Sequence, residues 1–322
     1  MASTPRTLVV ERQIICGSVH DSQVIEFRDK YKPLYPGLKF STDINPLCHR
    51  KVLATQGYEA EIRHAVIDFN NGKEYPDINT AWIPGTWEYA VTTVPSRVHT
   101  LLPQTLDSLT TAGFEDPIIA VDGELEPSDN SFLRKWSSQI WTRQNIRTFA
   151  HWHMTMLELY TRNPWANFYA IFQDDFIAVR NLKHYLTQNP CPHRGYMNLL
   201  TFMENESKIA SLPFGWSEAA CGGDKRQFGR GAVALAFSHT AVETLLTQPH
   251  LTTRRRNSLK GHISVDGAIV ESMNNAGWRE YIHKPSLVQH TGIESSMGNN
   301  RHPIAASFPG QDYNPLTLLQ TT

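Results

Sequence analysis

The sequence lacks the features that mark several large classes of protein. Its 322 residues contain four cysteines, Cys16, Cys48, Cys191 and Cys221, which lie far apart and form no Cys-x-x-Cys pair. This spacing argues against a zinc ribbon, and the chain length argues against a disulfide framework. There is no apolar run of about 18 residues and no charged start followed by an apolar region, so neither a transmembrane helix nor a signal peptide is predicted. We therefore expect a cytoplasmic protein without a membrane span.

The chain also lacks an excess of charge of either sign. Charged residues make up 19% of the sequence and the formal net charge is −1, so nothing global indicates nucleic acid or an anionic membrane surface as the partner. The local exception is Arg254, Arg255 and Arg256, which share a loop with Lys260. This basic run is typical of a solvated loop, but it could also contact a phosphate-rich acceptor.

The chain is long enough for one large α/β domain, or for one such domain and a small one, and 40% of its residues are hydrophobic. Residues 74–87 carry two prolines and a glycine with little periodicity, and we place a boundary there. Residues 1–85 are expected to form an N-terminal elaboration or small domain of unknown role, with a strand over 7–16 and a helix over 57–72. Residues 86–322 are expected to form the main domain.

Strands and helices alternate in the first half of the main domain. The apolar patterns predict strands over 88–94, 117–121 and 168–172, a helix from a Thr100 cap to Gly113, and a helix over 144–160. Strand–helix–strand order implies parallel strands joined by right-handed crossovers. The expected fold class is α/β, with a mixed, mostly parallel sheet flanked by helices.

The second half of the main domain is less regular. A more antiparallel stretch is expected over 196–202 and 208–212, and a glycine-rich turn that ends at Gly231 precedes a buried strand over 232–237. The later elements are a helix opened by a Thr240-x-x-Glu243 capping box, a helix from about 264 to Gly277, and a last strand over 279–283.

An acidic pair, Asp174 and Asp175, directly follows the strand expected over 168–172 and Gln173. The carboxyl ends of parallel strands open into the ligand crevice of α/β proteins. Carboxylates there suit Mg²⁺ or Mn²⁺ that carries a phosphate. Aspartate is also a favoured helix cap, so the pair has a purely structural interpretation as well.

The two earlier strands also end in polar residues. Thr93 lies at the end of the first strand and Pro95 and Arg97 follow it, where an arginine can bind a phosphate or stack on a base. Asp122 ends the second strand and could accept a hydrogen bond from a ribose hydroxyl or a base N–H. A proline turn with a solvated arginine and an ordinary Asp-Gly turn are the structural alternatives.

Two later residues have the chemistry that such a site would need. Asp266 begins a helix, where a carboxylate can act as a general base or simply cap the helix. His290 follows the last predicted strand, where an imidazole could complete the coordination of a metal or make an ordinary hydrogen bond.

The order of these motifs resembles that of GT-A (Rossmann-like) nucleotide-sugar glycosyltransferases. The resemblance covers roughly residues 86–298 and rests on the segments 90–97 and 172–175 with Asp122, Asp266 and His290. The closing run, KPSLVQHTGIESS, specifically resembles the end of the N-acetylglucosaminyltransferase IV group. The acidic motif is Gln-Asp-Asp rather than Asp-x-Asp, so the metal contact is expected to fall on Asp175.

The resemblance implies a role for each candidate residue. Asp266 would be the catalytic base and Asp175 and His290 the ligands of Mn²⁺ or Mg²⁺. The remaining candidates would bind the donor or lie on the acceptor side: Thr93, Pro95, Arg97, Asp122 and Asp174 for the donor, and Gly231, Arg254, Arg255 and Arg256 for the acceptor.

The implied activity is transfer of a sugar from a nucleotide-sugar, in our expectation a UDP-sugar, to an acceptor hydroxyl with inversion. The acceptor would be a glycan, a small molecule or, as for phage enzymes of this kind, a modified DNA base. A metal-dependent phosphodiesterase or nuclease is the alternative of another class, but such sites usually hold two metals and need more acids than these motifs supply. A module that only holds a nucleotide is a third interpretation.

Overall fold

The computed structural model describes residues 85–146, 148–164, 166–219, 231–248, 265–291 and 304–320. The strand expected over 7–16, the helix expected over 57–72 and the basic run Arg254 to Arg256 all lie outside these residues. The proposed division at residue 85 therefore stays a prediction.

The described residues contain an eight-stranded sheet with the spatial order β3-β2-β1-β4-β8-β6-β9-β7. These strands are β1 (Trp87–Thr93), β2 (Ile118–Asp122), β3 (Ile140–Arg143), β4 (Phe168–Gln173), β6 (Gly195–Asn198), β7 (Gly215–Glu218), β8 (Ala234–Ser238) and β9 (Arg279–Lys284). β1 pairs in parallel with β2 and β4, β2 with β3, and β6 with β9, whereas β8 and β7 run antiparallel to their neighbours. The α/β class and the mixed, mostly parallel sheet are thus confirmed.

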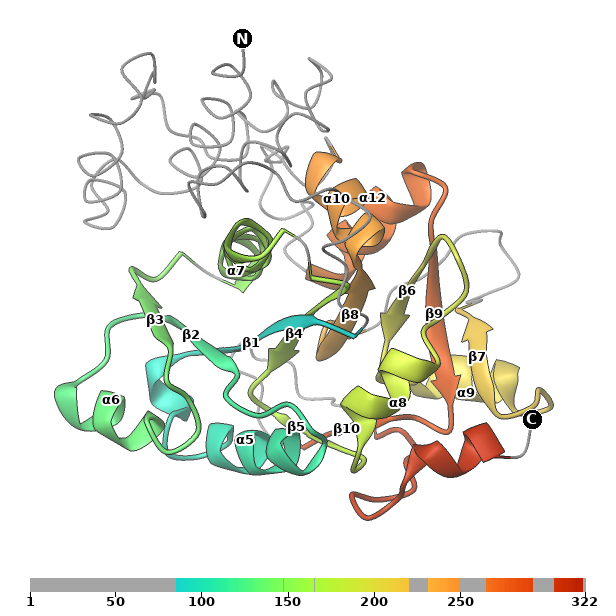
Figure 1. Cartoon of the computed structure of the whole chain (residues 1–322), viewed down its shortest axis with the longest axis horizontal. Helices are drawn as coiled ribbons and strands as arrows, with labels where there is room; N and C mark the ends of the chain where they lie inside the picture. The colour runs from blue at the N-terminus through green and yellow to red at the C-terminus, as the bar shows by residue number, and fades with distance from the viewer. Residues whose placement is uncertain are drawn as a thin grey trace, which may run out of the picture.

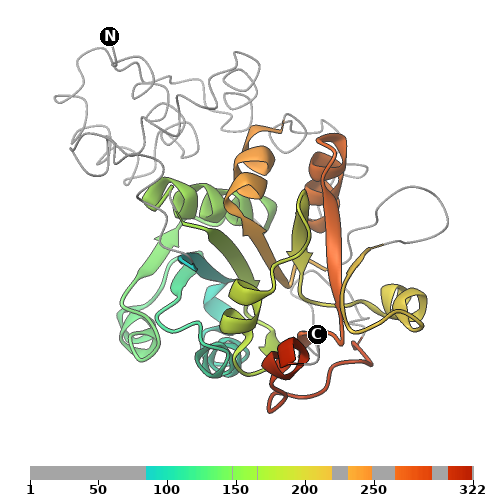
Figure 2. The same cartoon turned by 45° about the vertical axis from the view of Figure 1, so that its right-hand side comes forward.

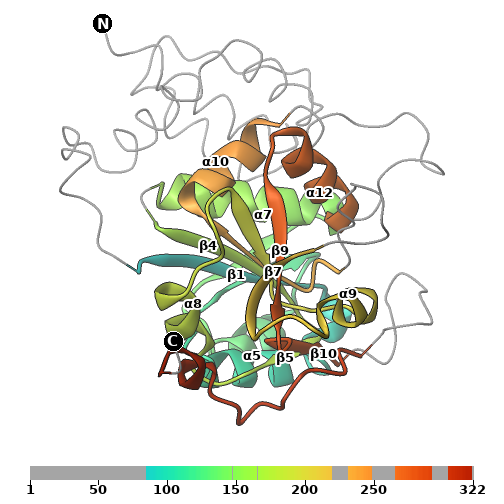
Figure 3. The same ribbon diagram turned by 90° about the vertical axis from the view of Figure 1, so that its right-hand side faces the viewer.

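Helices cover both faces of this sheet (Figure 1). On one side of the sheet in this view lie α7 (Thr148–Arg162), α10 (His239–Thr247) and α12 (Val265–Asn275), and on the other lie α5 (Leu102–Thr111), α6 (Pro127–Leu133) and α8 (Leu182–Gln188). Figure 3, turned by 90° about the vertical axis, shows the same two layers, with α9 (Met203–Ile209) to the right of β9 and β7. The sheet is therefore buried between two helical layers, which is the usual setting of parallel strands.

Strand β4 lies at the centre of the sheet and shows how the sequence produces this layering. Its side chains alternate between the two faces, as strand geometry requires. Tyr169 and Ile171 pack into the core beneath α7, α10 and α12, whereas Ala170 and Phe172 pack into the core that α5 and α8 cover. All four side chains are fully buried, so both faces of β4 are anchored just before its acidic end.

A small ribbon outside the main sheet carries the last candidate residue. β5 (Phe176–Ala178) and β10 (Val288–His290) pair antiparallel, with His290 opposite Phe176. The C-terminal segment supports this ribbon, because the side-chain amide of Gln289 exchanges two hydrogen bonds with the backbone of Ala305, at 2.9 and 3.2 Å. Further along, η2 (Pro315–Gln320) packs against α8 (Figure 2).

Several local expectations were wrong. Thr100 does not cap α5, which begins at Leu102 without a side-chain cap. Helix α10 is capped by Ser238, which accepts from the N–H of Ala241, and Glu243 instead accepts from the hydroxyl of Tyr160. The strand expected over 208–212 is the end of α9 and a turn, and β3 and α6 are additional elements. Within the described residues, no helix has the length and apolar character needed to cross a bilayer.

Candidate functional site

The candidate residues that the structure describes gather at one edge of the sheet. β1, β2 and β4 are mutually parallel, so Thr93, Asp122 and the acidic pair after Gln173 all lie at the same edge. The antiparallel β8 begins at that edge, where the N–H of Gln173 donates to the carbonyl of Val233 over 2.7 Å. The topology therefore joins the ends of β1 and β4 to the segment that starts at Gly231.

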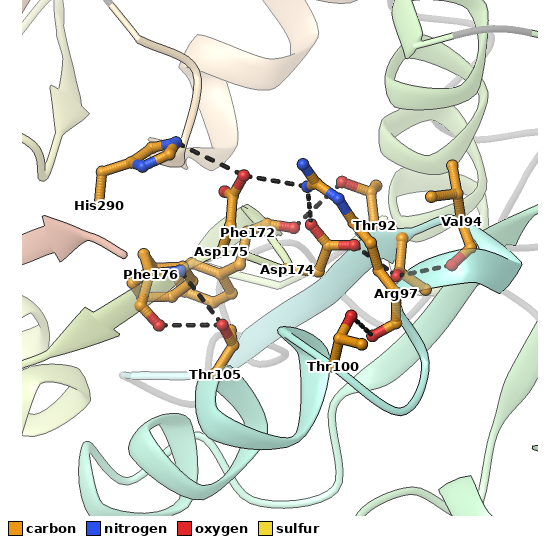
Figure 4. Close-up of polar contacts among 11 residues, drawn as sticks. Thr92, Val94, Arg97, Thr100, Thr105, Phe172, Asp174, Asp175, Phe176 and His290 are labelled. Carbon is orange, nitrogen blue, oxygen red and sulfur yellow. Dashed lines mark hydrogen bonds and ion pairs between the residues drawn. The ribbon is translucent and has the colours of Figure 1, made fainter. Parts of the chain in front are cut away.

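Arg97 connects the two carboxylates of the acidic pair (Figure 4). It lies in the short helix η1 (Pro95–Arg97) that follows β1, and its Nη1 donates to Asp174 Oδ1 over 2.6 Å and to Asp175 Oδ2 over 3.0 Å. Burial alone would lower the pKa of Arg97, but the charges and hydrogen bonds of both aspartates raise it. Arg97 therefore stays charged and holds the two carboxylates close together.

Asp174 has a protein donor on each carboxylate oxygen. Besides Arg97, it accepts from the hydroxyl of Thr93, whose Oγ1 lies 2.5 Å from Oδ2. Burial raises the pKa of Asp174 even though Arg97 acts to lower it. This residue therefore organises the loop after β1 against the end of β4.

Asp175 differs from its neighbour in having an oxygen without a partner. Its Oδ2 lies 3.0 Å from Arg97 Nη1 and 3.4 Å from His290 Nε2, so the carboxylate stands between these two side chains (Figure 4). Its Oδ1 is buried and accepts no hydrogen bond. A buried carboxylate oxygen without a donor is energetically unfavourable, which makes this atom the natural point for a cation to bind.

Asp122 and Pro95 adjoin this centre and have structural partners. Asp122 Oδ1 accepts from the N–H of Ile146 over 2.8 Å, which connects the end of β2 to the segment before α7. Gly123 has φ +149°, and a Cβ atom there would lie 2.7 Å from Cγ of Pro95. The loops after β1 and β2 thus pack directly on each other, and only glycine permits this approach.

Asp266 and Gly231 are brought together at the same edge. Asp266 lies in the first turn of α12, and its Oδ2 accepts from the N–H of Gly231 over 2.9 Å while Oδ1 accepts from the N–H of Gly267. Gly231 has φ +78°, a conformation that favours glycine. Because Gly231 lies two residues before Val233, this contact brings Asp266 to the edge at which β4 ends.

The sequence interpretation missed a buried polar network beneath Asp266. Asn198 Nδ2 donates to the carbonyl of Gly231 over 3.2 Å and to Glu280 Oε1 over 2.7 Å. Burial raises the pKa of Glu280 to about 8, with the hydrogen bond from Asn198 opposing the shift and the charge of Asp266 adding to it. The sequence carries only a weak signal for this network, because Glu280 lies among other polar residues in the strand expected over 279–283, Arg-Glu-Tyr-Ile-His.

The described side chains fit a divalent ion only if a bound ligand completes its coordination. In the described part of the chain, no group of three or more His, Cys, Asp or Glu side chains is arranged to hold an ion. Mg²⁺ is nevertheless commonly bound by one or two carboxylates together with substrate phosphates. Asp175 supplies one such carboxylate through its unpartnered oxygen, and the imidazole of His290 lies beside it.

Comparison with known proteins does not assign the chain to a family. No protein-family model matches the chain, and no curated protein matches its sequence.

Proposed function

We propose that this chain is a GT-A type glycosyltransferase that moves a sugar from a UDP-sugar to an acceptor hydroxyl with inversion, using Mn²⁺ or Mg²⁺. The observation that carries the proposal is Asp175, whose buried Oδ1 has no partner although Arg97 and His290 flank the same carboxylate. Its location at the carboxyl end of a parallel strand is where α/β proteins bind ligands.

Donor binding would use the residues around the acidic pair. A bound divalent ion at Asp175 and His290 would neutralise the negative charge that develops on the departing diphosphate. Arg97 would donate to the phosphate oxygens, since a guanidinium matches their geometry. Thr93 and Asp174 would fix Arg97 in position through the two short hydrogen bonds that connect them.

Asp266 would act on the acceptor. Its carboxylate lies at the start of α12 and is oriented by the backbone N–H groups of Gly231 and Gly267. It would take the proton of the attacking hydroxyl as that oxygen bonds to the anomeric carbon and the bond to the diphosphate breaks. Attack opposite the leaving group gives inversion.

Two substitutions separate binding from transfer. Asp175→Ala should abolish both Mn²⁺-dependent binding of UDP and sugar transfer. Asp266→Asn should leave that binding intact and lower turnover by about 10²–10⁴-fold, the usual contribution of a general base. Isothermal titration with UDP and Mn²⁺ and release of UDP from a UDP-sugar with an acceptor measure the two properties.

Asp129→Asn is the matched control, because Asp129 is also a carboxylate in the first turn of a helix and is not a candidate site residue. Full activity of Asp266→Asn would remove that residue from the mechanism. Hydrolysis of a plain phosphodiester without any nucleotide-sugar would instead favour the nuclease alternative.

A further inference from the structure

A second buried oxygen without a partner lies beside Asp175. This atom is Oγ1 of Thr291, the residue that directly follows β10. The N–H of Thr291 donates to the carbonyl of Asp175 over 2.8 Å, which continues the β5–β10 pairing by one residue beyond His290 and Phe176. Asp175 and Thr291 therefore oppose each other at the open end of the ribbon.

Opposed residues of an antiparallel pair project their side chains from the same face, with Cβ atoms about 4.5–5.5 Å apart. This pairing places Asp175 and Thr291 at the open end of the ribbon, where Asp175 Oδ1 and Thr291 Oγ1 are both buried without a hydrogen bond. Polar atoms of this kind are rare in folded proteins unless a ligand, ion or water satisfies them.

We propose that Thr291 Oγ1 is a direct ligand of the divalent ion, beside Asp175 and His290; this inference rests on the proposed function. Both unpartnered atoms are oxygens, which hard cations such as Mg²⁺ and Mn²⁺ prefer. The hydroxyl supplies the third protein ligand that the described His, Cys, Asp and Glu side chains do not provide. The phosphates of the donor complete the coordination.

The test uses the full-length chain and measures Mn²⁺ affinity in the presence of UDP, from the paramagnetic resonance signal of free Mn²⁺. Thr291→Val keeps the shape of the side chain and removes the hydroxyl. We expect it to weaken Mn²⁺ binding by at least about tenfold, the lower end of the effect of losing a supporting group at a metal site. Thr291→Ser keeps the oxygen, and its Mn²⁺ affinity should stay within about threefold of that of the wild type, a much smaller change than for Thr291→Val.

Thermal unfolding without metal distinguishes a ligand from a structural hydroxyl. Replacing an unsatisfied buried hydroxyl by a methyl group is neutral or stabilising. Thr291→Val should therefore melt at the same or a higher temperature than the wild type while it binds Mn²⁺ less tightly. A variant that is both less stable and weaker in binding would overturn the proposal.

Thr105→Val is the matched control for the ribbon. The hydroxyl of Thr105 bonds to the backbone of Phe176 on β5 and does not contact the acidic pair (Figure 4). We expect it to lower stability and preserve Mn²⁺ affinity. An equal loss of Mn²⁺ affinity in Thr105→Val would overturn the proposal, because the effect would then come from displacement of the ribbon.

The remaining outcomes separate this inference from the proposed function. If the wild type and Thr291→Val bind Mn²⁺ equally in the presence of UDP, Thr291 is no ligand and the proposed function stands. If the wild type binds no Mn²⁺ with UDP, both proposals fail.

Discussion

Nη1 of Arg97 lies 2.6 Å from Oδ1 of Asp174, and this contact separates the roles of the two adjacent aspartates. With the Thr93 hydroxyl on Oδ2, each oxygen of Asp174 has a donor from the protein. Asp175 shares the same arginine but keeps one buried oxygen without a donor. Asp174 thus stabilises the site, whereas Asp175 is available to a ligand.

Neutralising each aspartate in turn should have different effects on stability. Asp174→Asn weakens short bonds to Arg97 and Thr93, and hydrogen bonds to charged groups contribute about 1.5–3 kcal/mol each. We expect its free energy of unfolding to fall by roughly that amount, about 1.5–3 kcal/mol. Asp175→Asn weakens only the bond to Arg97 and removes the charge from a carboxylate whose buried Oδ1 lacks a donor, so it should cost less, under about 1 kcal/mol. Urea denaturation without metal measures both variants, and a larger loss for Asp175→Asn would contradict this division of roles.

Glu280 should make the stability of the protein depend on pH. Burial raises its pKa in the folded state from 4.5 to about 8, so the folded chain binds the proton more tightly than the unfolded chain. The stabilising contribution of Glu280 is fully present below pH 4.5 and is lost as the pH rises through about 8. In that window the free energy of unfolding should fall by at most about 1.4 kcal/mol per pH unit because of this group.

Glu280→Gln is the control for that effect, since the amide does not titrate and can occupy the same space. We expect the difference in unfolding free energy between the wild type and Glu280→Gln to fall steadily from pH 4.5 to about 8. A difference that stays constant with pH would show that Glu280 is ionised throughout this range.

Gln289 should influence the metal site indirectly. Its amide holds Ala305 through two hydrogen bonds, and it directly precedes His290. Gln289→Ala should destabilise the chain by about 1–3 kcal/mol, from two bonds of about 1 kcal/mol each. It should also weaken Mn²⁺ binding with UDP by about tenfold, as loss of a supporting group at a metal site does.

Glu206→Gln provides the comparison for Gln289. Glu206 accepts from the N–H groups of Ala306 and Ser307 and so holds the same C-terminal segment without adjoining His290. It should lower stability and leave Mn²⁺ affinity unchanged. Equal losses of affinity in both variants would mean that the C-terminal segment, and not Gln289 alone, positions the imidazole.

The parts of the fold that depend on local pattern could be predicted from the sequence. β2 and β4 are continuous apolar runs, as expected for central strands that are buried on both faces. The stripe of Leu102, Leu106 and Leu109 is buried in α5, and Gly113 follows that helix with φ +88°. These features place the acidic pair at a strand end without any knowledge of tertiary contacts.

The parts that depend on distant contacts could not be predicted. The apolar residues of 208–212 suggested a strand, but α9 continues to Ile209. Glu206, in the middle of this helix, accepts hydrogen bonds from the backbone of Ala306 and Ser307. The second hydrogen-bond donor to Asp174 is the hydroxyl of Thr93, which is 81 residues away in the chain. The burial of Glu280 follows from β6 and β7, which pair with β9 on either side.

The most direct test of the central claim is a thermal-shift measurement on the wild-type chain with a panel of nucleotide-sugars, each with and without Mn²⁺. A ligand at a hundred times its dissociation constant stabilises the native state by about 2.7 kcal/mol. The account predicts that one UDP-sugar raises the melting temperature by several degrees, and only when Mn²⁺ is present. A melting temperature that no nucleotide-sugar changes, with or without Mn²⁺, would contradict the proposed function.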